Sequence, residues 1–148
     1  MVNLFGAQVP SAVALMLMGE TVLLAIFLGA WVLAKLHKGR DHHYVMLGAF
    51  AFDVLVFKPL MISRAFRVFG PFPWSGTSIS LHLYLDLVVA VLGVASIYLG
   101  FKYRVKKGAK MFLPPKGRMH KWTGYLFVAL WVATFVLGVK IFAWAHLG

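Results

Sequence analysis

The sequence predicts an all-α integral membrane protein in which four transmembrane helices form an antiparallel bundle. Of its 148 residues, 61% are hydrophobic and only 13% are charged, whereas soluble domains carry about 25% charged residues. The mean hydropathy is +0.84, and each of four apolar runs approaches the ~20 residues that a helix needs to cross a bilayer core. Too little polar sequence lies between the runs for a separate soluble domain, so we expect one transmembrane domain over residues 1–148.

The four runs define the expected helices in order. The first span covers about residues 11–36, and because no basic segment precedes it, we expect a retained helix and not a signal peptide. The others cover about residues 43–62, 79–101 and 120–144. Pro59 predicts a kink late in the second span, and the stretch 63–78, rich in aromatic residues, Gly and Pro, predicts an irregular interfacial loop. Short connections favour an up-down-up-down bundle.

The basic residues predict the orientation and the main partner. The net charge is +11, and eleven of the fifteen Lys and Arg lie in the stretches 35–40 and 102–121, between apolar runs. Such loops are typically cytoplasmic, which would leave both termini outside and bring the loops near anionic lipid headgroups. We therefore expect a multi-pass protein of the cytoplasmic membrane of a bacterium or archaeon, with the lipid bilayer as partner and no nucleic acid.

Two absences narrow the chemistry. The chain has no cysteine, which excludes disulfides, Cys-ligated zinc, iron–sulfur clusters and covalently attached c-type haem. Phosphate-binding loops and the HExxH and GxSxG motifs are also absent, so hydrolysis is not expected.

Histidines stand at the basic edges of the spans. His37, His42, His43 and His120 all fall at the predicted cytoplasmic ends of spans one, two and four. Neutral imidazole is the usual nitrogen ligand of haem iron, copper and zinc, so two histidines from different helices predict a bis-histidine b-type haem site. His42 and His120 form the best-placed pair, and His43 replaces His42 if the helix is rotated by one residue, about 100°. The alternative is that these histidines are polar interfacial residues.

Ionisable side chains also lie inside the apolar runs. Such residues usually mark a cavity, a proton path or a ligand site. His82 and Asp86 are four residues apart and share a helix face, so Asp86 can orient the imidazole at a second, outer site for haem or a quinol. The candidate proton or quinol residues are Asp86, Glu20, Asp53 and Lys140. The alternative is internal pairing of the acids with Lys58 or Lys140, and Asp53, the deepest acid, is expected to be protonated or paired.

Methionines offer a weaker alternative for metal binding. Methionine and histidine are plausible copper ligands, but methionine is also a common filler of helical cores, and no dense cluster occurs. Copper is therefore less favoured than haem b. The residues concerned are Met16, Met18, Met46, Met61, Met111 and Met119, with His146 near the outer end.

The segment from His42 to Phe50 fits the pattern H-x-x-x-M-L-x-A-F, and His120 is followed by Trp131 and Gly138. These features resemble the YozB-like family of small four-helix membrane proteins of bacteria and archaea, over about residues 33–142. The resemblance implies haem or copper handling beside haem–copper oxidases, and it favours His42, His82 and His120 over the other histidines. The chain departs from the family pattern at five positions. His43 and Tyr44 stand where basic residues are usual, and Glu20, Asp53 and Lys140 are additional charges within the spans.

The leading hypothesis is a b-type haem-binding membrane protein of a respiratory electron-transfer chain, acting as a small subunit or associate of a larger complex, with quinone as a second partner. Its enzymatic status stays open between an electron carrier and quinol oxidation. The alternatives are a haem–copper oxidase maturation factor and a cofactor-free accessory subunit.

Overall fold

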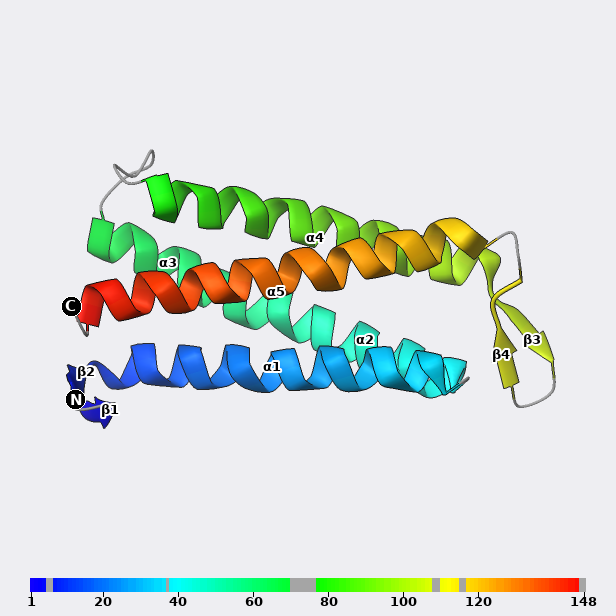
Figure 1. Cartoon of the computed structure of the whole chain (residues 1–148), viewed down its shortest axis with the longest axis horizontal. Coiled ribbons are helices and arrows are strands. Elements are labelled where there is room, and N and C mark those ends of the chain that lie inside the picture. Colours follow the sequence, from blue (N-terminus) through cyan, green and yellow to red (C-terminus); the bar gives the residue numbers. More distant parts are fainter. Residues whose placement is uncertain (5–6, 37, 70–76, 108–109, 115–116, 147–148) are drawn as a thin grey trace.

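The computed structural model describes residues 1–4, 7–36, 38–69, 77–107, 110–114 and 117–146. It confirms the all-α four-helix bundle, since four helical rods, each long and apolar enough to cross a membrane, run antiparallel to one another (Figure 1). The first rod is α1 (Ser11–Lys35), and the third and fourth are α4 (Thr77–Tyr103) and α5 (Arg118–His146). The second rod consists of three successive segments, α2 (Gly39–Phe52), η1 (Asp53–Phe57) and α3 (Lys58–Phe69).

Local chemistry sets where α1 begins and ends. Pro10 precedes its first residue, and its carbonyl accepts hydrogen bonds from the backbone N–H groups of Val13 and Ala14, at 2.9 and 3.2 Å. Lys35 occupies the last turn, where a positive charge interacts favourably with the negative end of the helix dipole. The apolar sequence between them contains no proline, so the helix runs unbroken through the predicted first span.

The second rod differs from the prediction at both ends. It begins at Gly39 instead of near residue 43, and it continues to Phe69 through part of the predicted interfacial loop. Pro59 does not end the rod. The preceding π-helical segment η1 widens the turn, and the N–H of Lys58 bonds to the carbonyl of Asp53, five residues back. This wider turn accommodates the missing donor and the bulky ring of Pro59.

Two short hairpins cap opposite ends of the bundle, and neither is predicted by the sequence pattern. Strands β1 (Val2–Leu4) and β2 (Ala7–Val9) pair antiparallel beside the start of α1, and β3 (Val105–Lys107) and β4 (Lys110–Phe112) pair between α4 and α5. Both hairpins are too short to carry an amphipathic pattern, which explains why the sequence gives no signal for them.

The core is aromatic and lies midway along the rods. Phe27 packs edge-on against Phe127 and Trp131, with ring centroids 5.4 and 5.1 Å away, and Phe50 packs against Phe127 at 5.9 Å. Gly93 makes room for Phe50, because a Cβ at that position would lie 2.2 Å from the ring. The outward faces of the rods are apolar and exposed, as expected where lipid replaces water.

The bundle therefore has two distinct ends (Figure 1). Both termini and the β1–β2 hairpin lie at one end, and the β3–β4 hairpin lies at the other, with the start of α2 and of α5. We call these the terminal end and the hairpin end.

Candidate functional site

Two groups of polar residues lie inside the bundle, one toward each end. At the hairpin end, His42 of α2 and His120 of α5 face each other, with ring centroids 6.5 Å apart and ring planes inclined by 69°. Each residue lies within the first turns of its helix. The antiparallel topology brings the two helix starts to the same end, which is how residues 78 positions apart meet.

The hydrogen bonds of this pair fix which ring nitrogen is available. His42 Nδ1 lies 2.8 Å from the carbonyl oxygen of Ala30, and His120 Nδ1 lies 2.8 Å from the carbonyl oxygen of Ser96. A carbonyl oxygen only accepts, so Nδ1 must carry the proton in both rings, and Nε2 keeps its lone pair. An Nδ1–H bond to a backbone carbonyl is the usual way in which a protein orients an imidazole that binds a metal through Nε2.

Neighbouring residues distinguish His42 from His43. The His43 ring packs edge-on against Phe101 at 4.4 Å, and its Nε2 lies 3.4 Å from Nη1 of Arg104, which donates to it. His43 thus faces the end of α4, and it is His42 that faces His120. Gly100 provides space for the His120 ring, because a Cβ there would lie 3.0 Å from the ring carbon Cε1.

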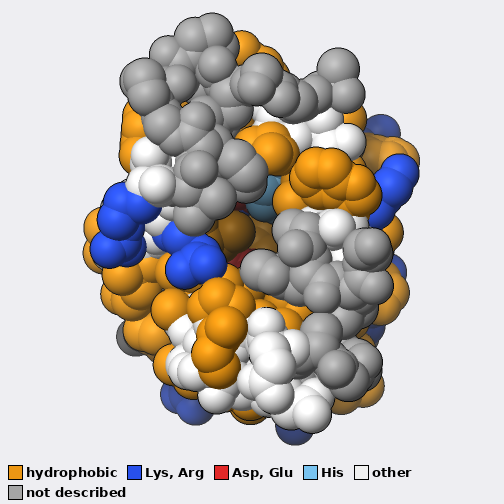
Figure 2. All heavy atoms as spheres, turned by 90° about the vertical axis from the view of Figure 1, so that its left-hand side faces the viewer, with side chains coloured by type: hydrophobic (Ala, Val, Ile, Leu, Met, Phe, Trp, Pro, Cys, Tyr) orange, Lys and Arg blue, Asp and Glu red, His pale blue; other side chains and the backbone are white. Residues whose placement is uncertain are grey.

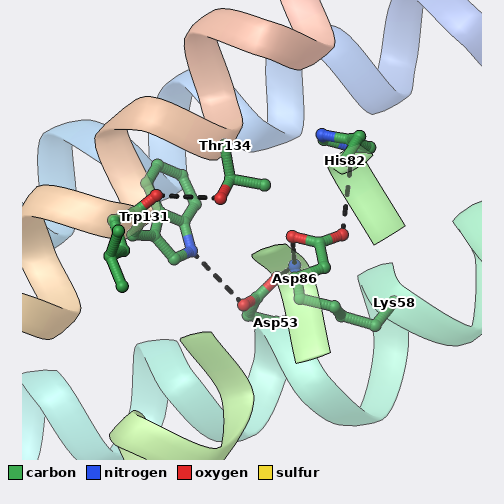
Figure 3. Close-up of polar contacts among 7 residues, drawn as sticks. Asp53, Lys58, His82, Asp86, Trp131 and Thr134 are labelled. Carbon is green, nitrogen blue, oxygen red and sulfur yellow. Dashed lines mark hydrogen bonds and ion pairs between the residues drawn. The ribbon is translucent and has the colours of Figure 1, made fainter. Parts of the chain in front are cut away.

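The second group, which we call the polar cluster, joins α4 to the second rod (Figure 3). Lys58 Nζ lies 2.9 Å from Asp86 Oδ1 and 3.7 Å from Asp53 Oδ1. All three side chains are buried or nearly so, with 12% of Lys58, 12% of Asp86 and 1% of Asp53 exposed. Of the two predicted lysine partners for the acids, Lys58 is the one that forms the ion pair.

The π-helical turn is what allows Asp53 to reach Lys58. In a regular α-helix, residues five apart point about 140° away from each other. The wider η1 turn returns the chain to the same face after five residues. Trp131 of α5 completes the environment of Asp53, because its indole N–H points at Asp53 Oδ2 with a nitrogen–oxygen distance of 3.5 Å (Figure 3).

His82 lies beside the ion pair but is not hydrogen-bonded to it. Its Nε2 is 3.9 Å from Asp86 Oδ2, beyond the range of a direct hydrogen bond. Its ring packs against Gly138 of α5, where a Cβ would lie 3.2 Å from the ring carbon Cε1. Asp86 therefore faces the His82 ring, as the sequence predicted, but it does not orient the ring through a direct hydrogen bond.

A cavity of about 410 Å³ lies directly above the polar cluster. It is lined by α1, α3, α4 and α5, and its polar members include Glu20, Lys58, His82 and Asp86. Figure 2, seen from the terminal end, shows a hollow between apolar side chains with acidic and histidine side chains at its floor. Asp53 does not line this cavity and lies beneath it, buried in the protein.

Buried polar atoms near the cavity lack partners. Glu20 Oε1 and His82 Nδ1 have no hydrogen-bond partner within the part of the chain that the structure describes, and both residues line the cavity. Buried polar atoms are satisfied in the great majority of cases, by protein, water or ligand. Because both residues line the cavity, water or a ligand in it can reach them.

Some predicted residues lie elsewhere. Lys140 is on the exposed face of α5 and does not line the cavity, although its neighbours Val139 and Ile141 do. Met16 and Met61 line the cavity, whereas Met18 and Met119 are exposed. Within the described ranges, no group of three or more His, Asp or Glu side chains is placed to hold a metal ion. His37 and the side chains of Met111 and His146 lie outside the described residues.

Sequence reasoning missed the residues that shape these sites without reacting. Gly100, which makes space for His120, was not singled out at all, and Trp131 and Gly138 were noted only as part of a family pattern, without their contacts to Asp53 and His82. The sequence offers a weak indication of the role of Gly100. Glycine in the middle of a helix costs about 1 kcal/mol relative to alanine, so its presence there indicates that a neighbouring group packs close to the backbone.

Comparison of the chain with protein-family models, with curated proteins and with solved structures found no match. The resemblance to the YozB-like family thus stays a prediction.

Proposed function

We propose that this chain is a membrane electron-transfer protein that holds one b-type haem between His42 and His120. The observation that carries the proposal is the facing pair of imidazoles, 6.5 Å apart between ring centres, from two different helices. Metal–nitrogen bonds of about 2 Å to each of two opposite imidazoles would place the ring centres about 6 Å apart. The donor set and its spacing thus fit a bis-histidine site.

The residues around the pair support this role. The carbonyls of Ala30 and Ser96 each accept the Nδ1–H bond that leaves Nε2 free. Arg104, together with Lys38, Arg40, Arg118 and Lys121, provides positive charge at the same end of the bundle for the haem propionates. A bound haem would supply reversible one-electron transfer, and the protein would supply axial ligands, orientation and a water-poor environment.

The orientation and the setting are part of the same proposal. By the positive-inside rule, the hairpin end faces the cytoplasm of a bacterium or archaeon, and both termini face outward. The histidine pair then lies near the inner surface of the cytoplasmic membrane. In this proposal the chain works with a partner, either a larger respiratory complex or a membrane quinone, and we place it in the YozB-like family.

The test is a reduced-minus-oxidised visible spectrum of the protein purified in mild detergent. We expect a sharp b-type band in the wild type that both His42→Ala and His120→Ala lose. His43→Ala is the matched control, because it alters the adjacent histidine of the same helix, whose ring faces Phe101, and it should retain the band. A wild-type protein without a band, or a band that survives both ligand substitutions, contradicts the proposal.

One observation favours a second function, that of a cofactor-free accessory subunit. Lys58 pairs with both Asp86 and Asp53 inside the bundle, as in the structural alternative for these residues. Under this alternative, His42→Ala and His120→Ala leave activity of the host complex intact, while Lys58 substitutions prevent its assembly. Activity of the complex in membranes carrying each variant separates the two functions.

A further inference from the structure

The cavity above the polar cluster combines apolar walls with a polar floor. Its walls come from all four surrounding helices and include Leu17, Ile79, Phe135 and Phe142. Its volume of about 410 Å³ falls within the range of about 300–1,000 Å³ that is typical of small-molecule sites. Such a cavity, open at the terminal end of a membrane bundle, suits a ligand that is mostly apolar and carries a few hydrogen-bonding atoms.

The charge of the floor excludes one class of ligand. Glu20, Asp86 and the underlying Asp53 surround the single ammonium group of Lys58. Lys58 already forms ion pairs with two carboxylates, so its charge is balanced within the protein. Arg64 is the other cation that lines the cavity. A phosphate or carboxylate ligand would meet like charges at the floor. The ligand that fits carries no negative charge and offers hydrogen-bond donors to the carboxylates.

The gap between His82 and Asp86 determines which hydrogen-bonding groups the ligand must carry. Lys58 binds Asp86 Oδ1, which leaves Oδ2 facing His82 Nε2 across 3.9 Å. One ligand oxygen between them closes the gap, because separations above 3.5 Å are commonly bridged by an intervening oxygen. A hydroxyl can donate to Asp86 Oδ2 and accept from His82 Nε2–H at once, whereas a carbonyl oxygen accepts only from His82.

A second polar contact is available at Glu20 of α1, which also lines the cavity. Glu20 Oε1 is buried without a hydrogen-bond partner in the described part of the chain, and rotation of the carboxyl group exchanges its two oxygens. Trp131 and Phe135 also line the cavity and stack with an interplanar angle of 9° and centroids 6.0 Å apart. They give the cavity a flat aromatic wall, against which a planar ring can pack.

We propose that this cavity binds the ring of a membrane quinone in its hydroquinone form. One ring hydroxyl donates to Asp86 Oδ2 and accepts from His82 Nε2–H, and the other donates to the Glu20 carboxylate. A neutral, planar, bilayer-soluble molecule with two oxygens on opposite sides of its ring meets every requirement of the walls and the floor. The bound quinone would serve as a redox partner of the haem, so its physiological role rests on the proposed function. The binding of the quinone ring does not depend on the haem.

The binding test uses the fluorescence of Trp131, a tryptophan that lines the cavity. Replacing the four other tryptophans with phenylalanine leaves Trp131, which lines the cavity and is 3% exposed. The protein is placed in phosphatidylcholine nanodiscs under anaerobic conditions and titrated with decyl-ubiquinol, and in parallel with menadiol, to distinguish a benzohydroquinone from a naphthohydroquinone. We expect saturable quenching of Trp131 fluorescence by at least one of them, and decylbenzene, which has the tail but no ring oxygens, should not compete.

A matched pair of substitutions locates the site. Val139→Phe fills the cavity, whereas Val136→Phe makes the same change on the lipid-facing side of the same helix, where Val136 is 60% exposed. Val139→Phe and His82→Leu should each weaken quinone binding about tenfold or more, the effect of losing one well-made buried contact. Val136→Phe should leave the affinity unchanged.

The outcomes separate this proposal from the previous one. In His42→Ala, quinone binding should persist at wild-type affinity even where the haem band is lost, so failure of the haem site leaves the quinone test intact. The quinone proposal is overturned if neither hydroquinone saturates, if decylbenzene competes as well as the hydroquinone does, or if Val139→Phe binds as tightly as Val136→Phe. The decylbenzene comparison uses the unsubstituted cavity, so it decides the matter even if Val139→Phe fails to fold.

Discussion

Replacing Lys58 with methionine should destabilise the bundle by about 3–5 kcal/mol, the usual cost of removing one partner from a buried ion pair. At an effective dielectric constant of about 20, the attraction of Lys58 Nζ to Asp86 at 2.9 Å is about 6 kcal/mol, and to Asp53 at 3.7 Å about 4 kcal/mol. The several kcal/mol that it costs to desolvate the ammonium group offset roughly half of this sum. Lys58→Met preserves the length and apolar body of the side chain, so little packing is lost.

The assay is reversible unfolding in mixed micelles with increasing dodecyl sulfate, followed by circular dichroism. The control is the double variant Lys58→Met/Asp86→Asn, in which the partner charge is removed together with the lysine. Because this variant leaves fewer unpaired buried charges, it should unfold with a smaller loss of free energy than Lys58→Met alone. A loss below about 1 kcal/mol for Lys58→Met, the level of an exposed pair, would refute the argument, because Lys58 would then extend to solvent and not bind the two acids.

Two further substitutions test the close approaches in the bundle, both against Gly29→Ala, whose added Cβ would meet nothing within 4 Å. Gly93→Ala places a Cβ 2.2 Å from the buried Phe50 ring and should lower the free energy of unfolding by about 1–3 kcal/mol. Unfolding as easy as that of Gly29→Ala would contradict the packing. Gly100→Ala places a Cβ 3.0 Å from the His120 ring and should shift or weaken the b-type band without changing quinone binding, as measured by the difference spectrum and by Trp131 quenching. An unchanged spectrum would show that the ring has room to move.

The sequence was sufficient to predict the four spans, because hydropathy over ~20 residues is a strong signal for a membrane helix. It also predicted that His42 and His120 would share one end, since an antiparallel bundle alone fixes that. It could not decide between His42 and His43, because the rotation of a helix about its axis depends on packing. Contacts of His43 with Phe101 and Arg104 settle that rotation, and they come from a distant part of the chain.

The polar cluster shows where sequence reasoning stops. Asp53 and Lys58 are five residues apart, a spacing that predicts opposite faces in a regular helix. The π-helical turn before Pro59 brings them together, and its position could not be inferred from the proline alone, for which a kink was the simpler expectation. Ionisable residues in the spans pointed to a cavity, but its lining could not be predicted, because it depends on how four helices pack against one another.

The two sites are far enough apart to be altered independently. On α5, His120 and the cavity-lining residue Thr134 are separated by 14 residues, or about 20 Å along the helix. The aromatic core around Phe127 fills the space between them. Substitutions more than about 10 Å apart without shared partners usually act additively. A purely structural role for both groups predicts that each variant fails through folding and so loses both properties together. Separate loss of the haem band in His42→Ala and of quinone binding in His82→Leu would instead require two sites with two ligands.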